Sequence, residues 1–165
     1  MKFLVLLVTF LAIDVHARNI VHIPAPKLDA KSYILIDYLT ASVLAEQNAD
    51  DRVEPASLAK IMTVYVAGHA LRSGLIALDD EVKVSEKAWR MAGSRMFIEV
   101  GKNVSVDDLL QGVIVQSGND ASVALAEHIS GSEDLFATIM TEHGRQLGMT
   151  GSGFSNSTGL PDKGT

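Results

Sequence analysis

The sequence contains no cysteine. A chain without cysteine has no thiol nucleophile, no disulfide framework and no thiolate metal site. It also lacks an apolar run of about 18 residues or more, so no membrane-spanning helix is predicted. Positively charged residues are fewer than negatively charged ones, with 14 lysines and arginines and 20 aspartates and glutamates. The resulting net charge of −6 argues against nucleic acid or an anionic membrane surface as a partner.

Two common hydrolase motifs are absent as well. The 5 histidines include no His-Glu-x-x-His zinc motif, which disfavours metal-dependent hydrolysis. No Gly-x-Ser-x-Gly elbow occurs, which disfavours an α/β-hydrolase. We therefore expect no metal and no cofactor.

The first 17 residues have the pattern of a secretory signal peptide. Lys2 supplies a positive end, and the apolar stretch from Phe3 to Ile13 is too short to span a bilayer. Val15 and Ala17 stand where a signal peptidase cleaves, which places the predicted cut after Ala17. The alternative is an N-terminal strand or core helix. The prediction is an exported protein of the bacterial periplasm or cell envelope.

The rest of the chain predicts one α+β domain with a hydrophobic core, since 47% of all residues are hydrophobic. Two apolar segments, 33–38 and 41–46, predict strands. A helix is predicted over 56–72, ending at Gly74, and its apolar residues nearly all round predict that it is buried. Further predictions, in chain order, are a short strand at 81–84, a short helix capped by Ser85, a helix capped by Ser105 and Asp108, a helix running to Gly131, and a helix opened by Ser132, Glu133 and Asp134 that stops at Gly148.

The segment VEPASLAKIMT places Ser57 three residues before Lys60 at the predicted start of a helix. Residues at this spacing share a helix face, so the hydroxyl and the amino group would be neighbours. The first turn of a helix also offers free N–H groups and the positive end of the helix dipole, which stabilise an oxyanion. A serine needs an adjacent base, and a lysine serves as one when burial lowers its pKa. The alternative is a capping serine beside a lysine whose stem covers apolar surface.

A second segment, QSGNDA, lies between two predicted helices. Ser117 and Asn119 flank a glycine there, and a loop at a helix junction can direct a hydroxyl and an amide into a cleft. Ser117 could relay a proton from Lys60 to a leaving amine, and Asn119 could bind the lysine or a substrate amide. The alternative is a helix-capping turn.

These motifs, in this order, resemble those of the penicillin-recognising serine enzymes. PASLAKIMT, SGN and the later GLPD are similar to the D-alanyl-D-alanine carboxypeptidases of peptidase family S11, the low-molecular-mass penicillin-binding proteins, over residues 27 to 165. The resemblance implies a penicillin-binding-protein or serine β-lactamase-like transpeptidase fold. It implies that Ser57 is acylated, Lys60 is the base, Ser117 is catalytic and Asn119 binds substrate. The implied partners are peptidoglycan stem peptides ending in D-Ala-D-Ala, with β-lactam antibiotics as inhibitors, and the implied processes are peptidoglycan biosynthesis, proteolysis at the cell wall and control of cell shape.

One departure from the family pattern is the missing third motif, Lys-Thr-Gly. The chain ends DKGT, which has a different order and follows SGN too soon. Residues 18–165 are therefore expected to be the N-terminal portion of a longer peptidase domain, with a helical cluster and only part of an antiparallel sheet. Alone they are expected to aggregate or to acylate very slowly, and any membrane association would come from regions beyond residue 165.

Two alternatives remain on sequence grounds. A class A-like serine β-lactamase shares the nucleophile but uses an additional glutamate to activate water, and no Glu-x-x-Leu-Asn sequence follows SGN. An inactive cell-wall-binding relative would keep the fold without turnover, although the intact set of Ser57, Lys60, Ser117 and Asn119 argues against it.

Overall fold

The structure is a computed structural model, and it describes residues 25 and 27–161. The chain divides into two units, Met1–Asp51 and Arg52–Thr165. The predicted signal peptide, residues 1–17, lies outside the described residues and stays a prediction. Among the residues that are described, no helix has the length and apolar character needed to cross a membrane.

The first unit contains a β-hairpin. Strands β1 (Tyr33–Ile36) and β2 (Val43–Gln47) pair antiparallel, with Tyr33 opposite Gln47. Both predicted strands are confirmed, but each has shifted bounds, and the register is irregular between Leu35 and Ile36.

The hairpin turn is longer than the two residues expected. Asp37 stabilises this longer turn, because its Oδ1 accepts hydrogen bonds from the backbone N–H groups of Leu39 and Thr40 at 3.2 and 2.8 Å. Ala41 closes the turn with a positive φ of 56°. An aspartate side chain thus replaces the glycine or asparagine of a two-residue turn.

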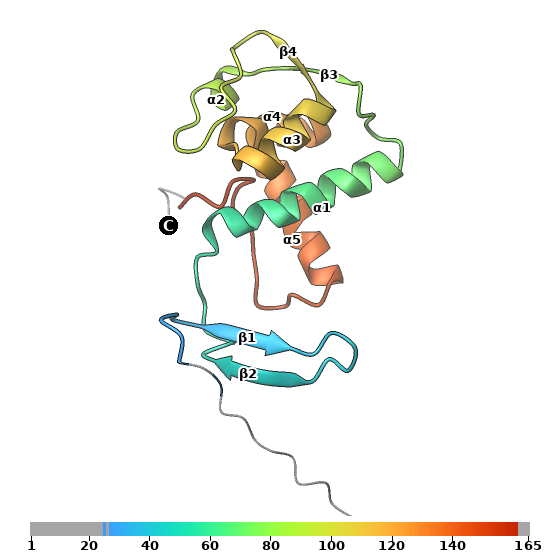
Figure 1. Cartoon of the computed structure of the whole chain (residues 1–165). Helices are drawn as coiled ribbons and strands as arrows, with labels where there is room; N and C mark the ends of the chain where they lie inside the picture. Colours follow the sequence, from blue (N-terminus) through green and yellow to red (C-terminus); the bar gives the residue numbers. More distant parts are fainter. Residues whose placement is uncertain (1–24, 26, 162–165) are drawn as a thin grey trace, which may run out of the picture. The chain divides into compact units, whose positions relative to one another are not determined.

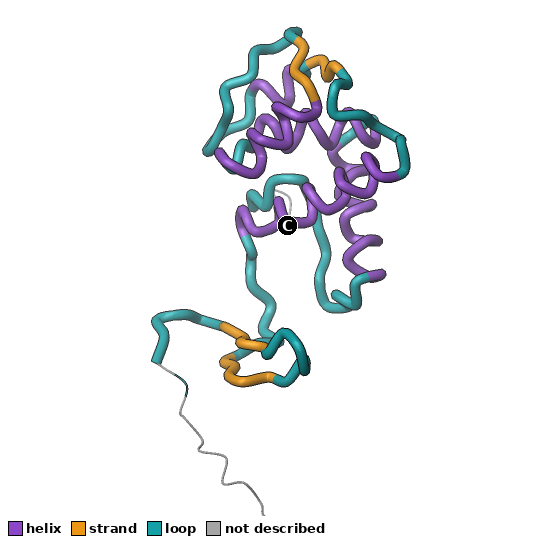
Figure 2. Tube along the Cα trace, turned by 45° about the vertical axis from the view of Figure 1, so that its right-hand side comes forward, coloured by secondary structure: helices purple, strands orange, loops and turns teal. Residues whose placement is uncertain are grey.

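The second unit is a helical cluster with a small sheet at its edge (Figures 1 and 2). Its elements, in chain order, are the 3₁₀ turn η1 (Ala56–Leu58), α1 (Ala59–Arg72), β3 (Glu81–Lys83), α2 (Glu86–Trp89), β4 (Asn103–Ser105), α3 (Val106–Gln116), α4 (Asn119–Ser130) and α5 (Glu133–Gln146). Strand β4, which pairs antiparallel with β3, was not predicted, because three residues are too few to show a strand pattern.

Serine side chains begin three of the helices, as predicted. Ser85, Ser105 and Ser132 each accept a hydrogen bond from the backbone N–H three residues further on. These caps satisfy N–H groups that have no partner within the helix. Polar signals at the helix starts therefore set the boundaries of α2, α3 and α5.

Helix α4 forms the centre of the core. Its residues 119–126 are all buried, and it packs against α1, α2, α3 and α5. A second apolar cluster joins Met62 and Val66 of α1 to Phe136 and Met140 of α5. These contacts fix the direction of α1, whose first turns carry the candidate site.

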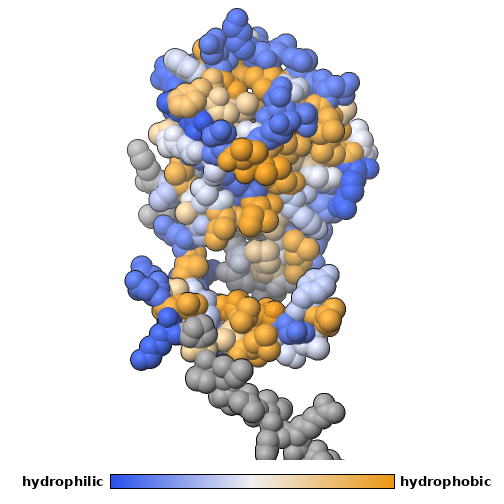
Figure 3. Space-filling model, in the orientation of Figure 1, coloured by the Kyte–Doolittle hydropathy of each residue, from blue (hydrophilic) through white to orange (hydrophobic). Residues whose placement is uncertain are grey.

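The prediction that α1 is buried all round is only partly correct. Its inner side is buried, including Met62, Val66 and Ala67, but Ile61 is 70% exposed and Leu58, in the preceding turn, is 67% exposed. Hydrophobic side chains accordingly appear at the surface of the helical unit, in orange in Figure 3. The apolar periodicity predicted the helix correctly and its exposed side incorrectly.

Candidate active site

Ser57 lies in the 3₁₀ turn that leads into α1, rather than in the α-helix itself. Pro55 precedes the turn, and its carbonyl accepts the N–H of Leu58 at 3.1 Å. The Ser57 side chain is exposed, and its backbone N–H has no hydrogen-bond partner within residues 27–161. A solvent-facing hydroxyl beside a free N–H is a suitable position for a nucleophile whose attack creates an oxyanion.

Lys60 lies one turn later and is buried, with 4% of its surface exposed. Its Nζ is 3.4 Å from Ser57 Oγ and donates a hydrogen bond of 2.9 Å to the backbone carbonyl of Thr158. The serine contact is long, but catalytic hydrogen bonds often are before substrate binds. The predicted pair of hydroxyl and amino group therefore does lie side by side.

Burial lowers the pKa of Lys60 below its ordinary value. The cause is the loss of water around the charged form, which favours the neutral amine. No acidic side chain among the described residues forms an ion pair with Lys60 to oppose this effect. A neutral amine that holds one N–H on the Thr158 carbonyl has its lone pair free for the proton of Ser57.

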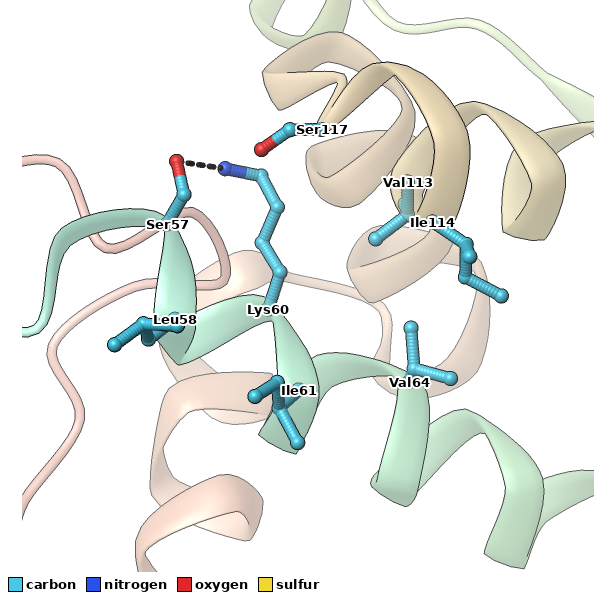
Figure 4. A pocket seen from close by; sticks show the side chains of 8 residues that line it. All are labelled: Ser57, Leu58, Lys60, Ile61, Val64, Val113, Ile114 and Ser117. Carbon is cyan, nitrogen blue, oxygen red and sulfur yellow. Dashed lines mark hydrogen bonds between the residues drawn. The ribbon is translucent and has the colours of Figure 1, made fainter.

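A cavity opens over this pair (Figure 4). It is lined by polar groups at one end and aliphatic side chains at the other: Ser57, Leu58, Lys60, Ile61, Val64, Val113, Ile114 and Ser117. The Ser117 hydroxyl points toward the amino end of Lys60, which lies between the two serines. The structure thus brings together three of the four predicted site residues.

The backbone of Ser117 has a strained conformation. Ser117 ends α3 with φ 53° and ψ 37°, in the left-handed region that serine rarely occupies. Hydrogen bonds hold both of its neighbours, since Ser94 Oγ donates to Gln116 O and Gly118 N to Gly112 O. Such strain persists where the surroundings enforce it, and here it turns the hydroxyl toward the cavity.

Asn119 is the predicted site residue that does not line the cavity. It is 3% exposed, its Nδ2 donates to Ala92 O at 2.7 Å, and its backbone N–H donates to Ser94 O at 2.8 Å. Gly93 must be small here, because a Cβ at that position would lie 2.9 Å from the Asn119 amide nitrogen. These contacts join the 92–94 loop to the start of α4, and substrate binding by Asn119 stays a prediction.

Asp120 is a structural residue that the sequence did not reveal. It is 1% exposed, and its carboxylate accepts the backbone N–H groups of Met96, Phe97 and Ile98 at 2.8–3.2 Å. A buried carboxylate is stable in an apolar core when several donors surround it. Asp120 therefore fixes the loop that follows Ser94, close to the end of α3.

The segment 156–159 completes the site and was also missed. Ser157 O accepts the hydroxyl of Thr63 at 2.7 Å, next to the bond from Lys60 to Thr158 O. Asn156 Oδ1 accepts the N–H groups of Thr158 and Gly159 at 3.1 and 2.7 Å, which makes a tight turn. An asparagine three residues before a glycine was the one available turn signal.

The arrangement supplies the parts of a serine acyl-transfer site. Ser57 offers the hydroxyl, Lys60 a buried amine with lowered pKa, and Ser117 a second hydroxyl near that amine. Within the described residues no cluster of three or more potential metal ligands is present.

Comparison with known proteins assigns the chain to a family. Residues 19–165 match the model of the D-alanyl-D-alanine carboxypeptidase family, peptidase S11. The chain belongs to this family. It is 46% identical over 144 residues to the D-alanyl-D-alanine carboxypeptidase DacC of Escherichia coli K12, covering 84% of this chain and 36% of that protein. The chain thus spans about a third of the length of the curated relatives it matches.

Solved structures agree with the family assignment. Penicillin binding protein 5 from Haemophilus influenzae superposes with a TM-score of 0.81 at 44% identity, over 85% of this chain and 42% of that one. Penicillin-Binding Protein D2 from Listeria monocytogenes, in its ampicillin-bound form, gives 0.76 at 26% identity, over 86% and 57%. The predicted penicillin-binding-protein fold is therefore confirmed, and the helices and hairpin described above correspond to part of it.

A substitution at Gly159 tests how tightly the 156–159 segment packs against the 3₁₀ turn that carries Ser57. Its φ is 75°, and a Cβ there would run into the backbone carbonyl of Ala56, next to Ser57. Gly131 has a similar φ of 82° but open space around it. We expect Gly131→Ala to lower the free energy of unfolding by about 1–2 kcal/mol, the cost of a left-handed alanine. Gly159→Ala should lower it further, as measured by urea unfolding, and equal losses would show that the close approach is unimportant.

Proposed function

We propose that the protein is a serine-type D-Ala-D-Ala carboxypeptidase that acts on peptidoglycan stem peptides through an acyl-enzyme on Ser57. The observation that carries the proposal is the burial of Lys60 Nζ within reach of Ser57 Oγ, with Ser117 in the same cavity. Membership of family S11 supports the reaction and the substrate. Relatives named as carboxypeptidases favour this function over that of a β-lactamase or an inactive wall-binding module.

The proposed reaction begins with proton transfer from Ser57 Oγ to the neutral amine of Lys60. The oxygen then attacks the carbonyl carbon of the penultimate D-alanine, and the free N–H of Ser57 donates to the oxyanion. Lys60 returns the proton through Ser117 to the amine of the terminal D-alanine as the peptide bond breaks. Water hydrolyses the ester, which frees Ser57 and the shortened peptide.

β-Lactam antibiotics are proposed to inhibit the protein by acylating the same serine. The Listeria monocytogenes relative is described in an ampicillin-bound form, and a serine with a neutral amine beside it is suited to opening a strained lactam. Residues 18–165 are predicted to aggregate or to acylate very slowly by themselves, so the following two tests use the full-length protein.

Labelling with a fluorescent penicillin tests the nucleophile. The label should be attached to the peptide that contains Ser57, and Ser57→Ala should abolish it, because no other described serine forms a hydrogen bond with Lys60 Nζ. Peptide mass spectrometry identifies the site. A label on Ser117 would overturn the assignment.

Substitution of Lys60 tests the base. Arginine keeps a positive charge but does not release its proton near neutral pH. Lys60→Arg should therefore slow acylation by about 10²–10⁴-fold, the usual contribution of a general base. In the wild type, acylation should rise with pH as Lys60 loses its proton, and the rise should come below the pH at which an ordinary lysine titrates, because burial lowers the pKa of Lys60. Near-normal acylation by Lys60→Arg would show that charge alone suffices.

We also propose that the protein is exported to the periplasm or cell envelope and contributes there to peptidoglycan biosynthesis and cell shape. Support comes from Lys2, the apolar stretch that follows it, and the location of peptidoglycan outside the cytoplasmic membrane. N-terminal sequencing of the protein recovered from the envelope should begin at Arg18. A protein that retains Met1 or Lys2 would contradict the predicted cleavage.

A further inference from the structure

An ion pair, buried at its glutamate and half-exposed at its lysine, contacts the 156–159 segment. Lys87 Nζ of α2 lies 2.9 Å from Glu133 Oε2 at the start of α5, and Glu133 is 6% exposed. The other carboxylate oxygen, Oε1, accepts both the N–H of Ser157 at 3.0 Å and its hydroxyl at 2.7 Å. One carboxylate therefore connects α2, α5 and the segment that covers Lys60.

Ser157 and its neighbour Thr158 connect this carboxylate to α1. The carbonyl of Ser157 accepts the hydroxyl of Thr63, and the carbonyl of Thr158 accepts Lys60 Nζ. Thr63 lies one turn after Lys60 and is fully buried. A displacement of Ser157 would move both carbonyls and uncover the amino group.

The charges of the ion pair fit this role. Burial tends to raise the pKa of Glu133, but hydrogen bonds from Lys87 and Ser157 outweigh it and hold the pKa below its usual value. The hydrogen bond to Glu133 raises the pKa of Lys87, and the nearby carboxylates of Asp134 and Glu127 act in the same direction. The carboxylate is thus ionised at neutral pH, and its bonds to Ser157 are charge-assisted and strong.

We propose that Glu133 and Lys87 are positioning residues for the catalytic base: through Ser157 they hold the Thr158 carbonyl against Lys60 and keep water away from its amino group. The inference rests on the proposed role of Lys60 as general base. Neither residue of the pair lines the cavity, and a chain of contacts connects them to Lys60 through Ser157 and the Thr158 carbonyl.

The proposal predicts a specific change in the titration of Lys60. When the segment loosens, water reaches the amino group, the charged form is stabilised, and the pKa of Lys60 moves up toward that of a free lysine. In Glu133→Ala, acylation at neutral pH should fall about tenfold or more, as part of the 10²–10⁴-fold that a general base provides. The pH at which acylation rises should move upward, and activity should recover at high pH.

The experiment measures two quantities in the full-length protein. The first is the pH dependence of acylation by a fluorescent penicillin. The second is the titration of the Lys60 ¹³Cε resonance in lysine-labelled protein without penicillin, assigned by its loss in Lys60→Arg. Failure of the wild type to acylate would refute the proposed function, whereas the titration tests the positioning role without any turnover.

Two further variants keep the test decisive. Glu86→Ala breaks the exposed ion pair with Arg90, on the same helix as Lys87, and should leave both measurements at wild-type values. Ser157→Ala removes the hydroxyl bond but keeps the backbone bond to Glu133, so it should shift both measurements less than Glu133→Ala and remains available if Glu133→Ala fails to fold. The proposal is overturned if Glu133→Ala, or Ser157→Ala where Glu133→Ala does not fold, titrates Lys60 at the wild-type pH.

Discussion

The burial of one amino group determines the rest of the candidate site. Lys60 Nζ is withdrawn from water into a helical core, where an unpartnered ammonium would be costly. The Thr158 carbonyl gives it one hydrogen bond without adding a charge, so the amine remains easier to deprotonate than an exposed lysine. That carbonyl reaches the lysine only because Gly159 lets the chain pass against the backbone of Ala56. The burial of Lys60 thus depends on the path of a loop far along the sequence.

Local signals in the sequence predicted the helices well. Serines at 85, 105 and 132 cap the helices that follow them through hydrogen bonds within four residues of sequence. The spacing of Ser57 and Lys60 predicted their proximity, since a 3₁₀ turn running into an α-helix keeps residues three apart on nearly the same side. Ser117 followed from the motif and its position at a helix junction.

The parts that sequence reasoning missed depend on backbone atoms or on partners distant in the chain. The Thr158 carbonyl leaves no signature, because every residue has a carbonyl. Asp120 was one acidic residue among many until the structure placed it against three backbone N–H groups. The exposed side of α1, at Ile61, could not be predicted, because the sequence of this helix is apolar nearly all round. Strand β4 exists only because β3 pairs with it.

The hydrogen bond from Lys60 to Thr158 joins residues 98 positions apart. A ribosome delivers the chain from its N-terminus, so Ser57 and Lys60 are made long before the segment that covers them. Until that segment arrives, Lys60 lacks the Thr158 carbonyl and part of the burial that lowers its pKa. In the proposed mechanism, Ser57 therefore gains its base only when the helical unit has closed on itself.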